Sequence, residues 1–164
     1  ILRNFDLSPA DSALVVSSSG CNRVPIEVAE GFQRRGVKVV AIVSRRHADA
    51  SRSNDPRGAK LHDFADLVLD TGAPAGDACV YVPGLDTPVS PISTVGGCLL
   101  VNAIKAEVAL RLTEAGQPPI VLTASINVGS ERAAELFNAA YDEHARRLAV
   151  LYATMGADTG AARA

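Results

Sequence analysis

Apolar stretches of strand length alternate with amphipathic helical stretches in the first part of the chain. Residues 13–17 and 37–43 are apolar, as in strands of a covered parallel sheet. Between them, residues 23–35 have helical periodicity and stop at Gly36, a typical residue at the end of a helix. A strand, a helix and a second strand in this order are typical of parallel neighbours joined by a right-handed crossover. The pattern therefore predicts an α/β fold.

The next stretch is more polar and contains several turns. Residues 44–59 predict a long polar loop, and such loops are usually functional or mobile. A short helical piece is predicted at 59–64. Two further strands are predicted at 66–70 and 78–82, followed by another loop at 83–91.

Two long helices are predicted in the last third of the chain. Apolar residues recur at helical spacing over residues 93–114 and 130–153. Between these helices, residues 120–126 are expected to be extended. The last residues, 156–164, predict a flexible tail.

Composition narrows the class of protein. A chain of 164 residues with 48% hydrophobic residues predicts one globular domain. The net charge of −2 gives no reason to expect nucleic acid or an anionic membrane as a partner. The three cysteines lack metal-ligand or disulfide-framework spacing, so no disulfide framework and no metal site are expected. No cofactor is expected either. A reducing cytoplasm is the expected location.

The most informative stretch is Ser17-Ser18-Ser19-Gly20-Cys21-Asn22, which lies between the first strand and the first helix. Hydroxyls and free backbone N–H groups at a helix N-terminus favour an anion. The stretch lacks a lysine and the glycine spacing of nucleotide-binding loops, so it suits a phosphomonoester better than a triphosphate. The alternative is a serine-rich turn with an ordinary helix cap.

The same residues carry a resemblance to a known family. The motif Ser17-x-Ser19-Gly20-x-Asn22 resembles the phosphosugar-binding turn of the sugar isomerase (SIS) domain family. Residues 39–44, 65–72 and 91–94 resemble later segments of that domain. The stretch 19–29 looks closest to an uncharacterised bacterial branch of phosphosugar-binding SIS proteins.

This resemblance implies a flavodoxin-like, three-layer sandwich with a parallel sheet, formed by an SIS domain over residues 1–155. It also implies a sugar-phosphate ligand and a homodimer or homotetramer. A complete SIS domain has N-terminal helices and an earlier strand. Because the chain starts at Ile1 without them, we expect upstream residues in the biological protein and an incomplete site here.

The resemblance also implies which residues hold the ligand. The phosphate is expected on the turn, with two further hydroxyls from the start of the helix at 93–114: Ser17, Ser18, Ser19, Gly20, Asn22, Ser93 and Thr94. The alternative for the last two residues is simple helix capping. The small residues Gly96 and Gly97 should let another backbone come close to this helix.

Two side chains are candidates for proton transfer. Glu27 lies just after the turn and could move a proton between adjacent carbons, although a carboxylate there also stabilises the helix dipole. His47, in the polar loop, could assist ring opening or contact a sugar hydroxyl, or could simply be solvated. Glu30 and Arg34 fit a plain surface ion pair.

Three functions remain open at this point. The first is a sugar-phosphate isomerase active in carbohydrate metabolism. The second is a lyase or etherase acting on an amino-sugar phosphate. The third is a sensor that binds a phosphosugar without converting it. All three use the serine-rich turn to hold a phosphate.

Overall fold

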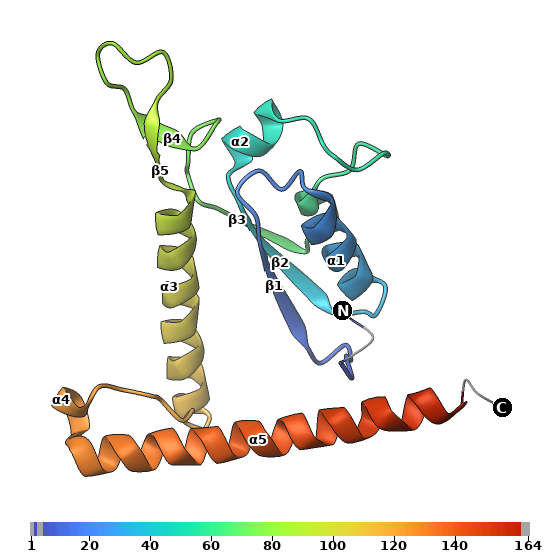
Figure 1. The fold of residues 1–164 in the computed structure, drawn as a ribbon, viewed down its shortest axis with the longest axis vertical. Helices are drawn as coiled ribbons and strands as arrows, with labels where there is room; N and C mark the ends of the chain where they lie inside the picture. Colours follow the sequence, from blue (N-terminus) through green and yellow to red (C-terminus); the bar gives the residue numbers. More distant parts are fainter. Residues whose placement is uncertain (1, 3–4, 162–164) are drawn as a thin grey trace. The chain divides into compact units, whose positions relative to one another are not determined.

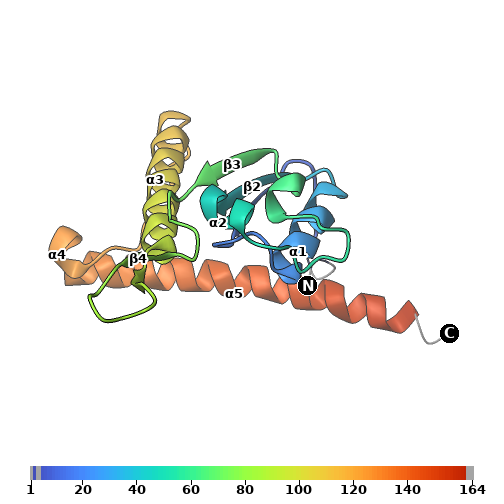
Figure 2. The same cartoon turned by 90° about the horizontal axis from the view of Figure 1, so that it is seen from above.

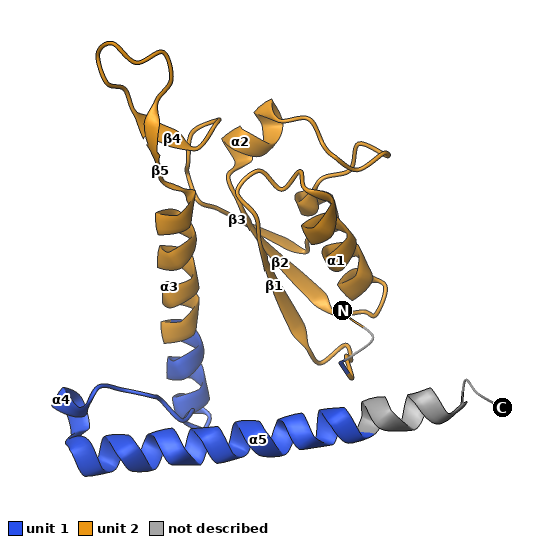
Figure 3. Cartoon of the chain, viewed as in Figure 1, with its two compact units in different colours: residues 1, 3–5, 107–164 blue, residues 2, 6–106 orange. Residues whose placement is uncertain are grey.

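A computed structural model describes residue 2 and residues 5–161, which divide into two compact units. Among these residues, unit 2 contains residue 2 and residues 6–106, and unit 1 contains the remainder (Figure 3). The division falls within one long helix, α3 (Ser93–Glu114), so each unit contains part of it. All the predicted site residues belong to unit 2.

A parallel sheet lies at the centre of unit 2. Its strands, in the order β1-β2-β3, are β1 (Ser12–Val16), β2 (Lys38–Val43) and β3 (Leu67–Asp70) (Figure 1). Leu14 lies opposite Val40, and Val40 lies opposite Leu67, so these three side chains share one face. The prediction of an α/β fold with parallel neighbouring strands is confirmed for these three strands.

One face of the sheet packs against helix α1 (Arg23–Gln33) and the short 3₁₀ helix η2 (Leu61–Phe64) (Figure 2). Ile26 of α1 and Leu61 of η2 are fully buried there, together with Val39 and Val43 of β2. Full burial of such an aliphatic side chain contributes about 1.5–3 kcal/mol. This cluster is the hydrophobic core that holds the turn between β1 and α1 in place.

The opposite face of the sheet is partly open. Leu14, Val16 and Leu67 are 41%, 53% and 54% exposed. Helix α3 comes close to this face at its N-terminal half, where a Cβ atom added to Gly97 would lie 3.7 Å from Val16 Cγ1. The three-layer sandwich stays a prediction.

The strand predicted at 78–82 forms outside the parallel sheet. Its residues form β4 (Ala78–Val80), which pairs antiparallel with β5 (Val89–Pro91). The prediction of a loop over the whole of 83–91 is therefore wrong at its end. A short connection between the two strands lets them pair with each other, whereas a parallel partner needs a longer crossover.

The polar stretch 44–59 also contains more structure than its composition predicts. It begins with the short helix α2 (Arg45–Ala50). The buried Ser44 side chain accepts a hydrogen bond from the His47 amide at 3.1 Å and donates one to the Ala73 carbonyl at 2.7 Å. This cap starts a helix where the sequence predicts only loop.

Unit 1 contains two further helices, α4 (Ser125–Val128) and α5 (Ser130–Ala161). Within the described chain, residues 120–124 pair with no strand, although Ile120, Val121 and Leu122 have strand-like side chains. These three residues are more than half exposed. The extended segment predicted at 120–126 is thus replaced at its end by the first residues of α4.

The two long helices begin where they are predicted to begin, and one of them also ends at its predicted residue. Helix α3 has the bounds predicted for residues 93–114, and α5 starts at the predicted residue 130 but continues to Ala161. The tail expected at 156–164 overlaps the end of α5, and its residues 162–164 lie outside the described residues. None of the described helices combines the length and apolar character needed to cross a bilayer.

We expect Leu61→Ala to lower the free energy of unfolding by about 2–5 kcal/mol, because it opens a cavity in the core. The matched control is Leu99→Ala, since Leu99 is 70% exposed on α3. It should change stability by about 0.5 kcal/mol or less. Urea denaturation of both variants measures the difference, and equal losses would show that the core is assigned wrongly.

Candidate functional site

The chain turns sharply between β1 and α1, at residues 17–22, and two serine hydroxyls fix the turn from within. The Gly20 amide donates to Ser17 Oγ, and the Cys21 amide donates to Ser19 Oγ, both at 3.2 Å. A hydroxyl oxygen that accepts a hydrogen bond still has its own O–H to donate. Ser17 and Ser19 therefore carry O–H donors whose oxygen atoms are held by the backbone.

Gly20 lies at the tightest point of this turn. Its φ of +64° is in the left-handed region, and a Cβ atom here would lie 3.3 Å from both Leu61 Cβ and Val43 Cγ2. Only glycine combines this backbone conformation with such close packing at little cost. The turn is thus held directly against the hydrophobic core.

Other segments fix the carbonyl groups of the turn. The Ser44, Asn54 and Leu61 amides donate to the Ser18, Cys21 and Gly20 carbonyls, at 2.9, 2.9 and 2.8 Å respectively. Within the described residues, the Ser18 and Ser19 amides donate to no protein acceptor. These two N–H groups are therefore available to a ligand.

Helix α1 begins directly after the turn, at the N-cap residue Asn22. The Asn22 side chain makes no capping hydrogen bond, and its Oδ1 instead accepts from Asn54 Nδ2 at 3.2 Å. The first turn of α1 contains no acidic residue. The positive end of this helix dipole is therefore free of a compensating carboxylate, which favours an anion.

His47 lies next to the turn, beside Ser18. Its Nδ1 is 3.2 Å from Ser18 Oγ, and its backbone is held by the Ser44 cap at the start of α2. The direction of the Ser18–His47 hydrogen bond depends on the imidazole tautomer. The structure thus brings a predicted proton-transfer residue to a predicted phosphate-binding residue.

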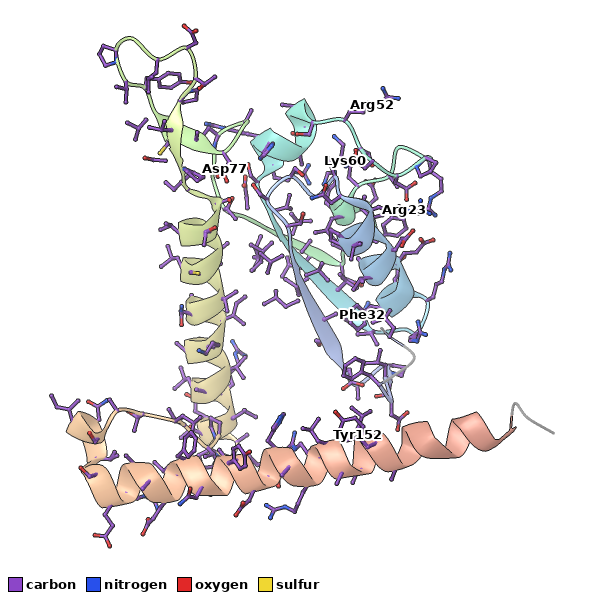
Figure 4. All side chains as sticks on the ribbon, in the orientation of Figure 1. Arg23, Phe32, Arg52, Lys60, Asp77 and Tyr152 are labelled. Carbon is purple, nitrogen blue, oxygen red and sulfur yellow. The ribbon has the colours of Figure 1, made fainter. Side chains whose placement is uncertain are left out.

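Asp77 holds the start of α3 (Figure 4), a role that no local sequence pattern predicts. Its carboxylate accepts from the Ser93 hydroxyl at 2.6 Å, the Ser93 amide at 2.7 Å and the Ile92 amide at 3.1 Å. The hydrogen bond from the Ser93 hydroxyl is the main cause that lowers the pKa of Asp77. The hydrogen bonds from the Ser93 and Ile92 amides and the electrostatic interaction with His47 lower it further, whereas burial acts in the opposite direction. Asp77 adopts a φ of +71°, which is uncommon for a residue other than glycine. The Asp77 carboxylate therefore caps the start of α3, and the Ser93 hydroxyl is already engaged as a donor to it.

A cavity of about 470 Å³ brings several predicted residues together. It lies between the ends of β1, β2 and β3 and the N-terminal half of α3, and its lining residues are Val16, Ser17, Ser18, Ile42, Thr71, Ser93, Thr94, Gly97, Cys98, Val101, Asn102 and Lys105. A Cβ atom on Gly96 would lie 3.0 Å from the Thr71 carbonyl oxygen, so the predicted close approach is confirmed. Ser19, Gly20 and Asn22 belong to the adjoining turn but do not line the cavity.

The structure does not bring Glu27 to this cavity. Glu27 Oε1 lies 2.6 Å from Arg23 Nε on the exposed surface of α1. Both side chains line a different hollow, together with Glu30 and Arg57. Glu27 thus forms an i,i+4 ion pair with Arg23. The predicted pair of Glu30 and Arg34 also forms, with 2.6 Å between Glu30 Oε1 and the Arg34 guanidinium.

Arg57 was also missed, and it ties the polar loop to α1. Its guanidinium lies 2.8 Å from Asp55 Oδ2 and 3.0 Å from Glu30 Oε2, and its carbon is 5.6 Å from the centre of the Phe64 ring. The hydrogen bonds from Arg57 lower the pKa of the buried Asp55 to about 2. The same loop carries Asn54, so Arg57 helps to position a residue that contacts the turn.

The residues that were missed each have one partner that is distant in sequence. Asp77 and Ser93 are 16 positions apart, and Arg57 and Glu30 are 27 positions apart. No local motif marks such contacts. Among the described residues, no group of three or more His, Cys, Asp or Glu side chains has the arrangement of a metal site.

Comparison with known proteins supports the resemblance. Residues 1–44 match the family model of the SIS domain. This segment contains β1, the whole turn, α1 and β2. The predicted resemblance to the SIS family is therefore confirmed, and the matched segment includes the candidate phosphate-binding turn.

Alignments with similar bacterial proteins cover more of the chain than the SIS match does. It is 38% identical over 136 residues to a UPF0309 protein of Brucella anthropi, covering 83% of this chain and 55% of that protein. It is 35% identical over 131 residues to a UPF0309 protein of Geobacillus kaustophilus, covering 79% and 52%. The chain thus spans about half the length of the curated relatives it matches.

Stability between pH 2 and pH 4 should depend on Asp55. The pKa of Asp55 is lowered to about 2 from its ordinary 3.8, so its ionised form stabilises the fold. This stabilisation is complete above about pH 4 and is lost as the pH falls through the folded-state pKa. We expect Asp55→Asn to be less stable than the wild type at pH 7, with the difference shrinking toward pH 2. Urea unfolding across this range measures it, and parallel pH profiles would contradict the role of the Arg57–Asp55 pair.

Proposed function

We propose that the chain binds a phosphosugar, with the phosphate on the turn at residues 17–22 and the sugar in the cavity beside α3. The observation that carries this proposal is the turn itself: held hydroxyls and available amides lie at the start of a helix without a first-turn carboxylate. The match of residues 1–44 to the SIS domain supports it. The cavity volume, about 470 Å³, is in the usual range for small-molecule sites.

The proposed roles follow from the contacts. Ser17 and Ser19 donate through their O–H groups, and the Ser18 and Ser19 amides donate through N–H. Gly20 allows the turn, Asn22 begins the helix whose dipole favours the anion, and Thr94 adds a hydroxyl from α3. Ser93 stays a weaker candidate because its hydroxyl already donates to Asp77.

We also propose that the parallel sheet belongs to a flavodoxin-like, three-layer sandwich within a domain over residues 1–155. The exposed apolar side chains of Leu14, Val16 and Leu67 support this arrangement, because one face of a parallel sheet is rarely left uncovered. The SIS match over residues 1–44 supports it as well.

The catalytic proposal is aldose–ketose isomerisation, with the Ser18–His47 pair moving the proton. Histidine is the side chain used most often for general acid–base catalysis. His47 acts through Ser18, which lines the cavity and lies 3.2 Å from the imidazole. Glu27 takes no part in this scheme, because its carboxylate is paired with Arg23 at the surface of α1.

Ser17→Ala tests the binding site. A thermal-shift screen against hexose, heptose and amino-sugar phosphates first identifies a ligand, which must raise the melting temperature. Loss of one charge-assisted donor should then weaken binding by about 1.5–3 kcal/mol, or roughly 10- to 150-fold in Kd. Ser12→Ala, on the exposed start of β1, is the matched control and should leave the Kd unchanged. An unchanged Kd for Ser17→Ala would refute the phosphate site.

His47→Gln tests the isomerase proposal. In deuterated water, isomerisation incorporates deuterium at the carbon next to the carbonyl, and His47→Gln should slow this at least about 100-fold. Ligand affinity should change little, and Glu27→Gln should retain both binding and exchange. Release of a hydroxy acid from an amino-sugar phosphate ether would favour the etherase instead. Binding without either reaction would favour a sensor.

A further inference from the structure

We infer that the cavity takes a phosphosugar with a second anionic group, a phosphate or a carboxylate, and that Lys105 binds this second group. The inference rests on the proposed phosphate site at residues 17–22. It concerns the other end of the same cavity, where Lys105 is one of the lining residues.

Lys105 is distant from the turn along α3. Thr94 and Lys105 both line the cavity and are eleven positions apart. A helix rises about 1.5 Å per residue, so their backbones are separated by roughly 16 Å along its axis. Helical side chains lean toward the N-terminus, and the flexible four-carbon stem of a lysine can extend in that direction. Lys105 therefore suits a group at the far end of a sugar phosphate rather than the phosphate on the turn.

Among the residues that line the cavity, Lys105 is the one with a formally charged side chain. The other lining side chains are hydroxyl, amide, thiol or apolar groups. Val16, Ile42 and Val101 provide apolar surface against which the carbon skeleton of a sugar can pack. A neutral cavity with one ammonium group at its end favours a ligand with one additional negative charge.

The neighbours of Lys105 give it no other electrostatic partner. Residues three and four positions away on the helix are Val101, Asn102, Val108 and Ala109, none of them acidic. Within the described residues, Lys105 forms no ion pair. By contrast, Arg111, farther along the same helix, lies 2.7 Å from Glu107. An unpaired exposed ammonium lining a cavity is available to an anionic ligand.

The test measures binding of three probes by isothermal titration calorimetry: fructose 6-phosphate, fructose 1,6-bisphosphate and 6-phosphogluconate. Wild type should bind at least one of the two doubly anionic probes about three- to tenfold more tightly than the monophosphate. Whether the bisphosphate or the sugar acid is preferred distinguishes a second phosphate from a carboxylate. Lys105→Met should remove this preference while leaving monophosphate affinity unchanged. Arg111→Met, also exposed on α3 but outside the cavity lining, is the matched control and should retain the preference.

The outcomes separate this inference from the proposed function. Equal affinity for all three probes, or a preference that survives in Lys105→Met, overturns the role of Lys105 and leaves the phosphate site standing. If none of the three probes binds, both the role of Lys105 and the phosphate site are overturned. A preference that disappears in Lys105→Met and weakens with added salt in the wild type supports the inference, because salt screens an exposed ion pair.

Discussion

The packing of Gly20 against Leu61 is the contact on which the rest of the candidate site depends. The Leu61 amide donates to the Gly20 carbonyl at 2.8 Å, and the Gly20 α-carbon lies against the Leu61 side chain, which is fully buried. One residue of η2 thus joins the hydrophobic core to the turn. Because Leu61 and Gly20 are both buried, the turn cannot change its path without opening the core. The serine hydroxyls are therefore placed by apolar packing as much as by their own hydrogen bonds.

The two helices that begin near the cavity differ in their electrostatics. Helix α1 has no acidic residue in its first turn, whereas the start of α3 is occupied by the Asp77 carboxylate. A carboxylate at a helix N-terminus offsets the positive end of the dipole. The attraction for an anion is thus concentrated at α1. This difference favours the turn at residues 17–22 over the start of α3 as the candidate phosphate site, although serine and threonine occur at both.

Local pattern predicted the strands at 13–17 and 37–43, the helices at 23–35 and 93–114, and the turn between β1 and α1. These features depend on neighbouring residues: apolar runs, helical periodicity, glycine and capping residues. The predictions failed where a contact between two separate segments decides the structure. The strand at 78–82 required knowledge of its antiparallel partner β5, and the role of Asp77 required contact with Ser93. Glu27 illustrates a different limit, because its position after the turn was evident but its direction was not. Its pairing with Arg23, four positions earlier on the same helical face, was the available local signal.

The close approach of α3 to Thr71 has a mechanical consequence. At Gly96 the helix backbone faces the Thr71 carbonyl with no side chain between them. The separation of α3 from the end of β3 at this point is therefore set by main-chain atoms, which cannot swing aside as a rotamer can. Any side chain larger than hydrogen at position 96 would push the first turns of α3 away from Thr71. Because Thr94 and Gly97 of these turns line the cavity, such a displacement would change the shape of the cavity without altering any lining side chain.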